Sequence, residues 1–456
     1  MIYKTMLELI GNTPIVELHH FDIGKSRLFI KLESQNPGGS IKDRIGLSMI
    51  EAAERDGRLR PGCTIIEATA GNTGLGLALA AAQKGYPLIL VIPDKMSTEK
   101  ILHLKALGAE VRMTRSDVEK GHPEYYQDVA ERLSREIPDA YFVNQFANPA
   151  NPLAHETGTG PEIWSQMNHA VDAVVVGVGS SGTLAGLTAF FKRVNPSVEL
   201  ILADPKGSIL ADYVNMGKFS SPGSWMVEGI GEDFLPSIAD FSLVRKAYKV
   251  SDAESFDTAR ALLRHEGIFA GSSTGVLVHA AVQYAREQSA AKNIVTFACD
   301  SGNKYLSKMY NDYWMADHGF AGRSAGSRVR DLISRRVEEH AVVSVVAEDS
   351  LMTAYSRMRL HEVSQLPVLC DNRVVGILDE SDILISVTDG GDGNFRQPVR
   401  DFMTLDVVTV APDDSIERLV PIFKKGWVGV VCDKDRFYGL VTPVDLLNHL
   451  RLKHQQ

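Results

Sequence analysis

The sequence predicts an α/β core built on parallel sheets, followed by a smaller module that occurs twice. Three observations support this prediction. From about residue 60 to residue 310, short β-rich apolar runs alternate with longer helical patterns. A stretch rich in glycine, alanine and serine then covers residues 319–327. Beyond it, the chain resembles itself at a spacing of roughly 65 residues.

The composition is that of several ordinary globular domains. The chain has 456 residues, of which 23% are charged and 44% are hydrophobic. At roughly 100 to 200 residues per domain, this length predicts about two to four folded units. The net charge of −9 is small, and the sequence contains no long run of basic residues. We therefore expect no binding to nucleic acid.

The sequence shows no membrane or secretion signal. Lys4, Glu8 and Glu17 interrupt the N-terminal segment, and no apolar stretch reaches the roughly 18 residues of a membrane helix. We expect no membrane partner and a cytoplasmic location. The four cysteines form no C-x-x-C pair, and the 13 histidines form no H-E-x-x-H motif, so we expect no metal site.

The elements of the core follow one another as alternating strands and helices. The expected strands are 64–66, 87–92, 173–178, 199–203 and 293–298, and the expected helices are 73–84, 99–107 and 183–193. Because strands and helices alternate, we expect βαβ crossovers and parallel sheets that helices cover on both faces.

The C-terminal part of the chain contains three segments that occur twice. Val329–Ile333 returns as Val399–Met403, Val342–Val345 returns as Val407–Val410, and Gly376–Leu384 returns as Gly439–Leu447. A solenoid needs at least about three units, so two copies predict a tandem pair of domains.

The first candidate functional segment is Asn36–Arg44 (NPGGSIKDR), in which a lysine follows a Gly-Gly turn. We expect Lys42 at the start of a helix, where the positive end of the helix dipole lowers the pKa of an ammonium. The free amine is the form that Schiff-base chemistry requires. The alternative is a solvated lysine in a first helical turn.

Two further segments are small-residue turns before expected helices. Thr69–Gly74 (TAGNTG) presents N–H groups and hydroxyls that bind a carboxylate or a phosphate. The alternative is a structural turn with Asn72 in a left-handed conformation. Gly271–Gly275 (GSSTG) precedes an expected helix over 276–288. Its hydroxyls bond a ring nitrogen or cap the helix, and we expect at least one serine to cap it.

The fourth segment, Gly177–Gly182 (GVGSSG), matches the G-x-G-x-x-G motif after a strand, and Asp204 lies about 20 residues further on. This spacing makes an NAD-dependent dehydrogenase an alternative function. The motif normally opens its domain, however, whereas here more than a hundred residues of α/β sequence precede it. A cup of this shape also suits a cofactor with a single phosphate.

These four segments, in this order, resemble the pyridoxal-phosphate enzymes of the β-replacement family, which includes cystathionine β-synthase and cysteine synthase. The resemblance runs from about Lys4 to Trp314, and the repeat resembles a pair of regulatory CBS domains. It implies a fold type II core of two parallel-sheet α/β subdomains and a C-terminal pair of α+β domains. The implied boundaries are 1–318 for the core, 319–327 for the linker, and 328–390 and 398–452 for the two CBS domains.

The resemblance also implies roles for single residues. Lys42 would be the catalytic lysine that forms the Schiff base with pyridoxal 5′-phosphate. Asn72 would bond the 3′ oxygen of the ring, and Ser273 would face the pyridine nitrogen. The phosphate would lie on Gly179, Ser180, Ser181, Gly182 and Thr183. The substrate would lie on Thr69, Ala70, Gly71, Thr73, Gln145 and Gly229, the last within the loop Glu228–Phe234.

The implied reaction is that of cystathionine β-synthase in transsulfuration. L-Serine, or an activated serine, would undergo β-elimination to an aminoacrylate, and L-homocysteine would add to give L-cystathionine, with hydrogen sulfide as a side product. The alternatives are a cysteine synthase acting on O-acetylserine, a threonine dehydratase and a non-catalytic adenosyl sensor. The chain begins at the core, without the N-terminal Cys/His extension that binds haem in animal members, so we expect no haem.

Three positions depart from the family pattern. Ala70 stands where serine is common, Ser181 replaces a frequent glycine, and Phe146 replaces the tyrosine of animal members. The loss of a hydroxyl at residue 70 leaves the choice of amino-acid donor open.

The second repeat carries an implied ligand site. Gly439–Asp445 matches the pattern G-h-x-[ST]-x-x-D, in which Thr442 and Asp445 would hold an adenosyl ligand. In the first repeat Asp379 takes the hydroxyl position, where a carboxylate would repel a phosphate. We therefore expect S-adenosylmethionine, with an adenine nucleotide as the alternative adenosyl ligand. The alternative is a purely structural or dimerising module, and the family implies a homodimer or a higher homo-oligomer.

Overall fold

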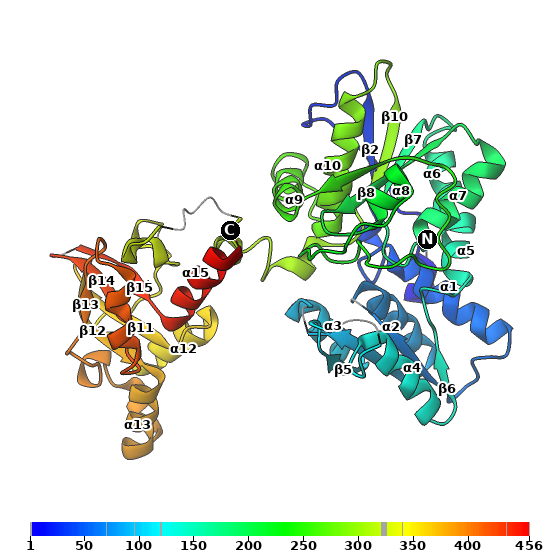
Figure 1. The fold of residues 1–456 in the computed structure, drawn as a ribbon. Helices are drawn as coiled ribbons and strands as arrows, with labels where there is room; N and C mark the ends of the chain where they lie inside the picture. Colours follow the sequence, from blue (N-terminus) through cyan, green and yellow to red (C-terminus); the bar gives the residue numbers. More distant parts are fainter. Residues whose placement is uncertain are drawn as a thin grey trace. The chain divides into compact units, whose positions relative to one another are not determined.

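A computed structural model describes residues 2–69, 71–94, 96–118, 121–320, 326–339, 341–434 and 436–455 of the chain. The chain divides into two compact units, Met1–Tyr310 and Asn311–Gln456, each of which is described by itself below (Figure 1). No helix among the described residues combines the length and the apolar character that a membrane crossing requires.

The first unit contains a four-stranded sheet whose strands are all parallel. Its order is β5 (Glu110–Thr114), β4 (Leu88–Pro93), β3 (Thr64–Ala68) and β6 (Ala140–Phe142). Successive side chains of a strand point to opposite faces. Ile65 and Leu90 therefore pack with α2 (Asn72–Lys84), whereas Ile66, Ile89 and Val91 pack with α4 (Tyr126–Glu136). Helices thus cover both faces of this sheet, as predicted.

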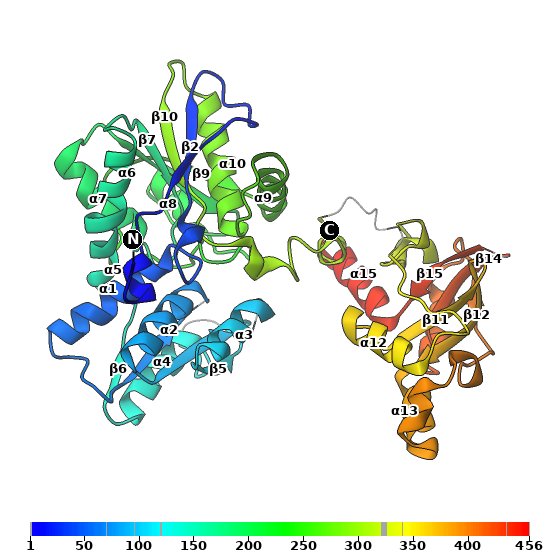
Figure 2. The ribbon, with the colours of Figure 1, turned by 180° about the vertical axis from the view of Figure 1, so that it is seen from behind.

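The six-stranded sheet of the first unit is parallel except at one edge. Its order is β1 (Ile15–Leu18), β2 (Arg27–Lys31), β10 (Asn293–Phe297), β7 (Ala173–Val176), β8 (Glu199–Pro205) and β9 (Val244–Val250), and only the β1–β2 pair is antiparallel. Helix α10 (Ser272–Arg286) packs along the sheet against β2, β10, β7, β8 and β9 (Figure 2). The prediction of an α/β core on parallel sheets is confirmed, and the antiparallel edge is an addition to it.

The expected helices are present and begin at or before the predicted residue. Those that shape the site are α1 (Lys42–Arg55), α2, α7 (Gly182–Val194) and α10, and the others are α3 (Thr98–Ala106), α5 (Ala150–Ala154), α6 (Gly160–Gln166), α8 (Leu210–Met216) and α9 (Asp252–Glu266). Helices α2, α7 and α10 begin at Asn72, Gly182 and Ser272, inside the glycine- and serine-rich segments that were expected to precede them. Small polar residues therefore form helix N-termini here.

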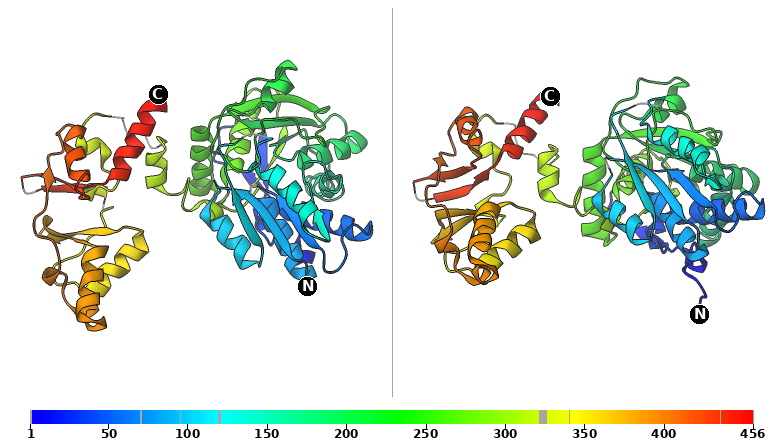
Figure 3. Two further views of the ribbon diagram at one scale, coloured as in Figure 1. Left: turned by 60° about the horizontal axis from the view of Figure 1, so that its bottom comes forward. Right: turned by 90° about the horizontal axis from the view of Figure 1, so that it is seen from below.

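Both halves of the second unit place an antiparallel strand pair between two helices, and the second half has one further strand. In the first half, α12 (Leu351–His361) precedes the antiparallel pair β11 (Gln365–Cys370) and β12 (Arg373–Asp379), and α13 (Glu380–Gly390) follows. In the second half, β13 (Thr409–Val410) and α14 (Val420–Phe423) precede β14 (Gly429–Asp433) and β15 (Arg436–Val441), and α15 (Pro443–Gln455) follows (Figure 3). The predicted tandem pair of α+β domains is confirmed.

The first segments of the two repeats are exchanged between the halves. Val329–Ile333 contributes to the apolar core of the second half, and the N–H of Val329 donates to the carbonyl of Asp414 at 3.0 Å. Val399 lies in the core of the first half, and its N–H donates to the carbonyl of Asp349 at 2.8 Å. Each half therefore completes its core with a segment that precedes the other half in the sequence.

A short helix before the linker belongs to the second unit. The guanidinium of Arg451 donates to the carbonyl of Asp317 at the end of α11 (Asp312–Asp317), and Arg335 lies over the ring of Tyr313. The division into compact units therefore falls at Tyr310, before the expected core boundary at residue 318. The expected domain boundaries stay predictions, and residues 321–325 of the linker lie outside the described residues.

Candidate active site

Lys42 is the first residue of α1 and follows the turn Gly38–Gly39. Asp43 holds this turn, because the N–H of Gly38 donates to its carboxylate at 2.6 Å. Burial lowers the pKa of the Lys42 ammonium, although the nearby Cys299, Asp300 and Glu232 act in the opposite direction. No hydrogen bond or ion pair with another described residue occupies the Lys42 amine. The amine is thus available for covalent chemistry, and Lys42 is not a solvated surface lysine.

The turn Thr69–Gly74 forms the N-terminus of α2. Gly71 has a φ of +117° and Asn72 is the first residue of the helix, so the left-handed conformation proposed for Asn72 is wrong. The N–H groups of Gly71 and Gly74 donate to the hydroxyl of Thr69 at 3.1 and 3.3 Å. Ala70 lies outside the described residues.

Gln145 joins this turn from the loop after β6. The hydroxyl of Thr73 donates to Gln145 Oε1 at 2.6 Å, and Gln145 Nε2 donates to the carbonyl of Ala68 at 3.2 Å. Three of the residues expected at the substrate, Thr69, Thr73 and Gln145, therefore lie in one buried cluster.

A carboxyl group that sequence reasoning missed lies beneath this cluster. Glu67 is fully buried at the end of β3, and the N–H of Gln145 donates to it at 3.2 Å. Burial raises the pKa of Glu67 to about 8, against several hydrogen bonds that lower it. The neutral acid is therefore the main form at neutral pH. No motif surrounds Glu67, so no signal in the sequence indicated it.

The glycine-rich cup leads from β7 into α7. Ser181 precedes the helix with a φ of +72°, in the left-handed region that favours glycine. A Cβ on Gly182 would lie 1.7 Å from Asn151 Oδ1, and a Cβ on Gly179 would lie 2.7 Å from the carbonyl oxygen of Gly229. The cup thus requires both glycines, and it brings the loop that carries Gly229 against the expected phosphate site.

A buried histidine contacts the last residue of the cup. The ring of His155 lies 3.3 Å through Nε2 from the hydroxyl of Thr183, and 2.9 Å through Nδ1 from that of Thr159. Burial holds the pKa of His155 well below its usual range. The ring is therefore neutral and orients the Thr183 hydroxyl without adding charge beside an anion. His155 was not among the expected site residues.

The serine pair at the start of α10 does not cap the helix. The N-cap is Gly271, and no side chain makes a capping hydrogen bond, so the expected serine cap is wrong. Ser272 accepts a hydrogen bond from the N–H of Glu228 at 3.0 Å instead, which ties α10 to the Glu228–Phe234 loop. Ser273 is buried beside the thiol of Cys299, whose pKa burial raises to about 12. Ser273 and the Cys299 thiol are therefore both uncharged where the pyridine ring of the cofactor is expected.

Asp204 does not serve as the acidic residue of a dinucleotide site. It is fully buried, and its carboxylate accepts a hydrogen bond from the N–H of Ala211 at 2.8 Å, at the start of α8. Asp204 therefore stabilises the N-terminus of α8. In a dehydrogenase, the acidic residue at this spacing would instead bind a ribose.

A chain of buried polar side chains connects the separate segments of the site. Glu228 receives hydrogen bonds from Lys100 at 2.6 Å and from Lys308 at 2.7 Å. Lys100 and Asp300 both bond the hydroxyl of Tyr305, and Asn72 donates to Asp300 at 2.7 Å. None of the three residues that link Glu228 to Asn72, which are Lys100, Tyr305 and Asp300, was predicted as a site residue.

The residues at the site fit pyridoxal phosphate. A monoanionic or dianionic phosphate needs donors, and the buried hydroxyl of Ser181 has no hydrogen-bond partner among the described residues. The free amine of Lys42 and the helix N-termini of α2 and α7 complete the requirements of a carbonyl cofactor with one phosphate. A bound phosphate would accept a hydrogen bond from the Ser181 hydroxyl, which otherwise has no partner among the described residues.

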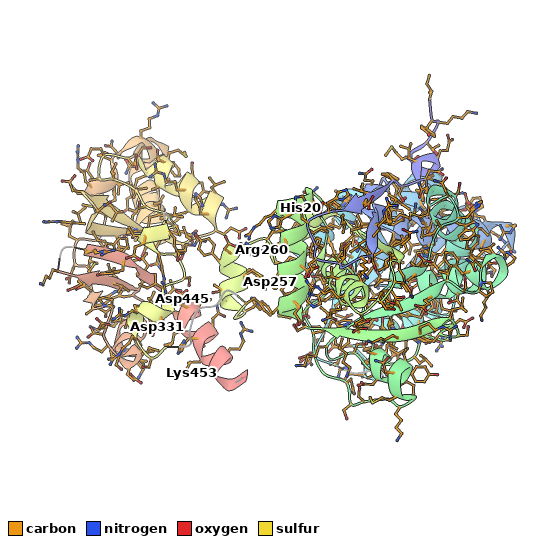
Figure 4. The ribbon with its side chains drawn as sticks, turned by 90° about the horizontal axis from the view of Figure 1, so that it is seen from above. His20, Asp257, Arg260, Asp331, Asp445 and Lys453 are labelled. Carbon is orange, nitrogen blue, oxygen red and sulfur yellow. The ribbon has the colours of Figure 1, made fainter. Side chains whose placement is uncertain are left out.

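The expected ligand residues of the second unit lie at the start of α15. The N–H and the hydroxyl of Thr442 both donate to Asp445 Oδ2, at 2.7 and 2.6 Å. The other oxygen of Asp445 accepts a hydrogen bond from Ser334. Figure 4 labels Asp445 and also Asp331, which lies in the 3₁₀ helix Val329–Leu332 that contacts α15. In the first half, Asp379 caps α13 by accepting from the N–H of Asp382 at 2.9 Å.

Family models match nearly the whole chain. The model of the pyridoxal-phosphate dependent enzymes matches residues 6–300, and the CBS domain model matches residues 329–389 and 399–452. A cystathionine β-synthase of Dictyostelium discoideum is 34% identical over 100% of this chain and 94% of that protein. The chain therefore belongs to the pyridoxal-phosphate dependent enzyme family. It is a pyridoxal-phosphate-dependent enzyme homologous to cystathionine β-synthase, and the dehydrogenase alternative is set aside.

Further curated relatives carry the same name. The cystathionine β-synthase of Saccharomyces cerevisiae is 34% identical over 98% of this chain and 97% of its own length. That of Apis mellifera is 42% identical over 70% of this chain, which spans 64% of the honeybee protein.

Two solved structures match about two thirds of this chain. An O-acetylserine dependent cystathionine β-synthase from Helicobacter pylori is 36% identical with a TM-score of 0.62. A hydrogen sulfide-producing enzyme from Fusobacterium nucleatum is 35% identical with a TM-score of 0.63. These two structures cover 68% and 67% of this chain, and 98% and 100% of their own chains are matched.

Proposed function

We propose that the chain is a cystathionine β-synthase that condenses L-serine, or an activated serine, with L-homocysteine to L-cystathionine. The observation that carries the proposal is the partly buried Lys42 at the start of α1, whose amine pairs with no other described residue, in a core where two helix N-termini suit an anion. Relatives of that name aligned over nearly the full chain support the same reaction.

Pyridoxal phosphate, when bound, supplies the electron sink that makes the α-proton of an amino acid acidic. Lys42 removes that proton, and its ammonium then protonates the departing β-hydroxyl, which is otherwise a poor leaving group. Thr69, Thr73 and Gln145 hold the substrate carboxylate at the N-terminus of α2. Ser273 would place a neutral hydroxyl, rather than a carboxylate, at the pyridine nitrogen, and a neutral partner there would make the cofactor a more moderate electron sink. This suits elimination, because the leaving group takes the electrons.

The second candidate reaction uses an activated donor. The relatives of known structure include an O-acetylserine dependent enzyme and a hydrogen sulfide-producing enzyme. Acetate leaves without protonation, so a donor with an acetyl group demands less of Lys42. A cysteine synthase that joins O-acetylserine and sulfide is therefore the alternative to test.

A comparison of four substrate pairs separates these reactions. Serine and O-acetylserine are each supplied with homocysteine and with sulfide, and cystathionine and cysteine are quantified. The proposal expects cystathionine from serine and homocysteine, and exclusive turnover of O-acetylserine with sulfide contradicts it. Lys42→Ala is the control, because it should remove the visible absorption of the Schiff base together with turnover. A keto acid as the main product would indicate a dehydratase instead.

For the second unit we propose S-adenosylmethionine as a ligand at Thr442 and Asp445. The contacts that support this are the paired Thr442 and Asp445 side chains, because the Asp445 carboxylate is an acceptor that suits ribose hydroxyls. Ser334 bonds the same carboxylate and would have to release one oxygen. Calorimetric titration with S-adenosylmethionine tests this, and a folded protein that produces no heat rejects the ligand.

We further propose a cytoplasmic homodimer or higher homo-oligomer with pyridoxal phosphate as its only prosthetic group. Cys63, Cys299, Cys370 and Cys432 are free thiols, which supports a reducing compartment. Analytical ultracentrifugation tests the oligomeric state. The absence of haem stays a prediction, and a Soret band in the purified protein would contradict it.

A further inference from the structure

A buried lysine joins the two segments that carry Lys42 and Asn72. Lys304 lies in the short 3₁₀ helix Gly302–Tyr305, and only 6% of it is exposed. Its Nζ donates to the carbonyl of Gly38 at 3.1 Å, to the carbonyl of Gly39 at 3.0 Å and to Asn72 Oδ1 at 3.0 Å. The three hydrogens of one ammonium therefore match three acceptors on two separate turns.

These contacts determine which way the amide of Asn72 points. An ammonium only donates hydrogen bonds, and an ionised carboxylate only accepts them. Lys304 must therefore face the amide oxygen, while Asp300, at 2.7 Å, must face the amide nitrogen. One N–H of Asn72 is used by Asp300, and the second N–H is left to donate elsewhere. The usual ambiguity in the orientation of an asparagine amide is thus removed by its two charged neighbours.

We propose that Lys304 is a positioning residue of the cofactor site, which fixes the Asn72 amide with one N–H directed to the ring oxygen of pyridoxal phosphate and fixes the Gly38–Gly39 turn before Lys42. This inference rests on the proposed function and deepens it. Lys304 touches neither substrate nor reacting atoms in this role. It acts through Asn72 and through the backbone that begins α1.

The cost of burying this lysine argues that the contacts matter. Burial lowers the pKa of Lys304 to about 8, with Asp300 and Asp43 raising it and Lys100 lowering it further. A buried charge is expensive unless hydrogen bonds compensate it, and an apolar side chain would fill the same space at lower cost. Gly39 lies directly against this lysine, since a Cβ there would be 3.5 Å from Nζ, an ordinary contact, and its φ of +75° is what favours glycine at this position.

The test compares two lysines that are both buried. Lys304→Met removes the ammonium at the site, and Lys31→Met removes the ammonium that donates to Thr13, Gln166 and Glu162 outside it. Both apo-proteins are titrated with pyridoxal phosphate, and the visible absorption of the bound cofactor and the thermal unfolding of the apo-protein are recorded. A buried hydrogen bond to a charged group is worth roughly tenfold or more in affinity.

For Lys304→Met we expect roughly tenfold or greater loss of affinity for pyridoxal phosphate and a shifted visible band. Lys31→Met should lower the unfolding temperature and leave the band in place. Lys304→Gln, which keeps a donor but no charge, should give an intermediate affinity and serves if the methionine variant does not fold. A wild-type band and affinity in a folded Lys304 variant would overturn the inference. Wild-type protein that takes up no pyridoxal phosphate would overturn the proposed function, and this role with it.

Discussion

Gly76 of α2 lies against the backbone carbonyl of Lys42 in α1, so closely that a Cβ on Gly76 would stand 2.5 Å from the Lys42 oxygen. The contact is reciprocal, because a Cβ on Gly46 would stand 2.5 Å from the carbonyl carbon of Gly76. The two helices meet backbone to backbone. The position of Lys42 is therefore set by the same helix whose first residue is Asn72.

Gly76→Ala should separate these helices. Overpacking of a tight contact typically costs about 1–3 kcal/mol, so we expect the free energy of unfolding to fall by about 2 kcal/mol together with a loss of cofactor affinity. Chemical denaturation and cofactor titration measure the two effects. Gln83→Ala, on the exposed side of α2, is the control. If helix propensity alone mattered, Gly76→Ala would instead stabilise the protein by up to about 1 kcal/mol.

Glu67 should make stability fall with rising pH. Its pKa is about 8 in the folded chain against a usual 4.5, so the folded state holds the proton more tightly. The contribution of Glu67 to the free energy of unfolding is fully present below about pH 4.5 and is lost as the pH rises toward 8. The free energy should fall by at most about 1.4 kcal/mol per pH unit over this range. Glu67→Gln, a neutral variant of the same shape, should remove this slope.

The measurement is the free energy of unfolding of wild type and Glu67→Gln at several pH values between 5 and 8. The exposed Glu136→Gln serves as the control. Parallel curves for wild type and Glu67→Gln would show that Glu67 is ionised in the folded chain.

Arg44 holds two carboxylates in the interior of the first unit. Its guanidinium donates to Glu33 at 2.7 and 2.8 Å and to Glu162 at 2.7 Å. Arg44→Met leaves both acids without this partner and should cost about 3–5 kcal/mol of stability. Arg27→Met, which removes a surface pair with Glu17, should have a much smaller effect on stability, because water already screens that pair. Equal losses in the two variants would contradict the ranking.

The same cluster predicts sensitivity to acid. Arg44 and Lys31 bond Glu162 and lower its pKa to about 2, although burial acts in the opposite direction. The folded pKa lies below the usual 4.5, so this contribution is present above about pH 4.5 and is lost as the pH falls toward 2. In Glu162→Gln the free energy of unfolding should vary less over this range. Unfolding curves from pH 5 to pH 2 provide the test.

Asp445 and Asp382 are matched residues of the two halves, and only one should affect a ligand. Each accepts a hydrogen bond from the backbone N–H three residues earlier, at the start of α15 or α13. Substitution of either by alanine should cost about 1 kcal/mol of stability, as for other helix caps. Only Asp445→Ala should abolish the heat of S-adenosylmethionine binding. Loss of binding in both variants would place the ligand elsewhere or indicate a general effect on the module.

Local patterns predicted those parts of the site that short segments encode. The turns around Lys42, Asn72 and Gly179 could be found because each combines glycines with a strand before it or a helix after it. The expectation that at least one serine of Gly271–Gly275 caps α10 was wrong, since the hydroxyl of Ser272 instead bonds the distant backbone of Glu228. Local rules favour the local partner, and the tertiary contact prevailed.

The buried polar contacts could not be predicted because their partners are far apart in the sequence. Lys100 meets Glu228 and Tyr305 across separations of 128 and 205 residues, and neither Lys100 nor Tyr305 lies in a recognised motif. Glu67 and Lys304 are single ionisable residues, which composition would place on the surface. Their burial is set by the way the two sheets and their loops come together.

The exchange of Val329–Ile333 and Val399 between the halves has a consequence for how this module can be divided. If the chain were cut between residues 390 and 398, each fragment would keep the segment that packs in the other half and lose the segment that completes its own core. Neither fragment would be a self-sufficient folding domain. The smallest portable piece is the intact pair, so gene fusions and truncations that transfer it should preserve both copies and the stretch that joins them.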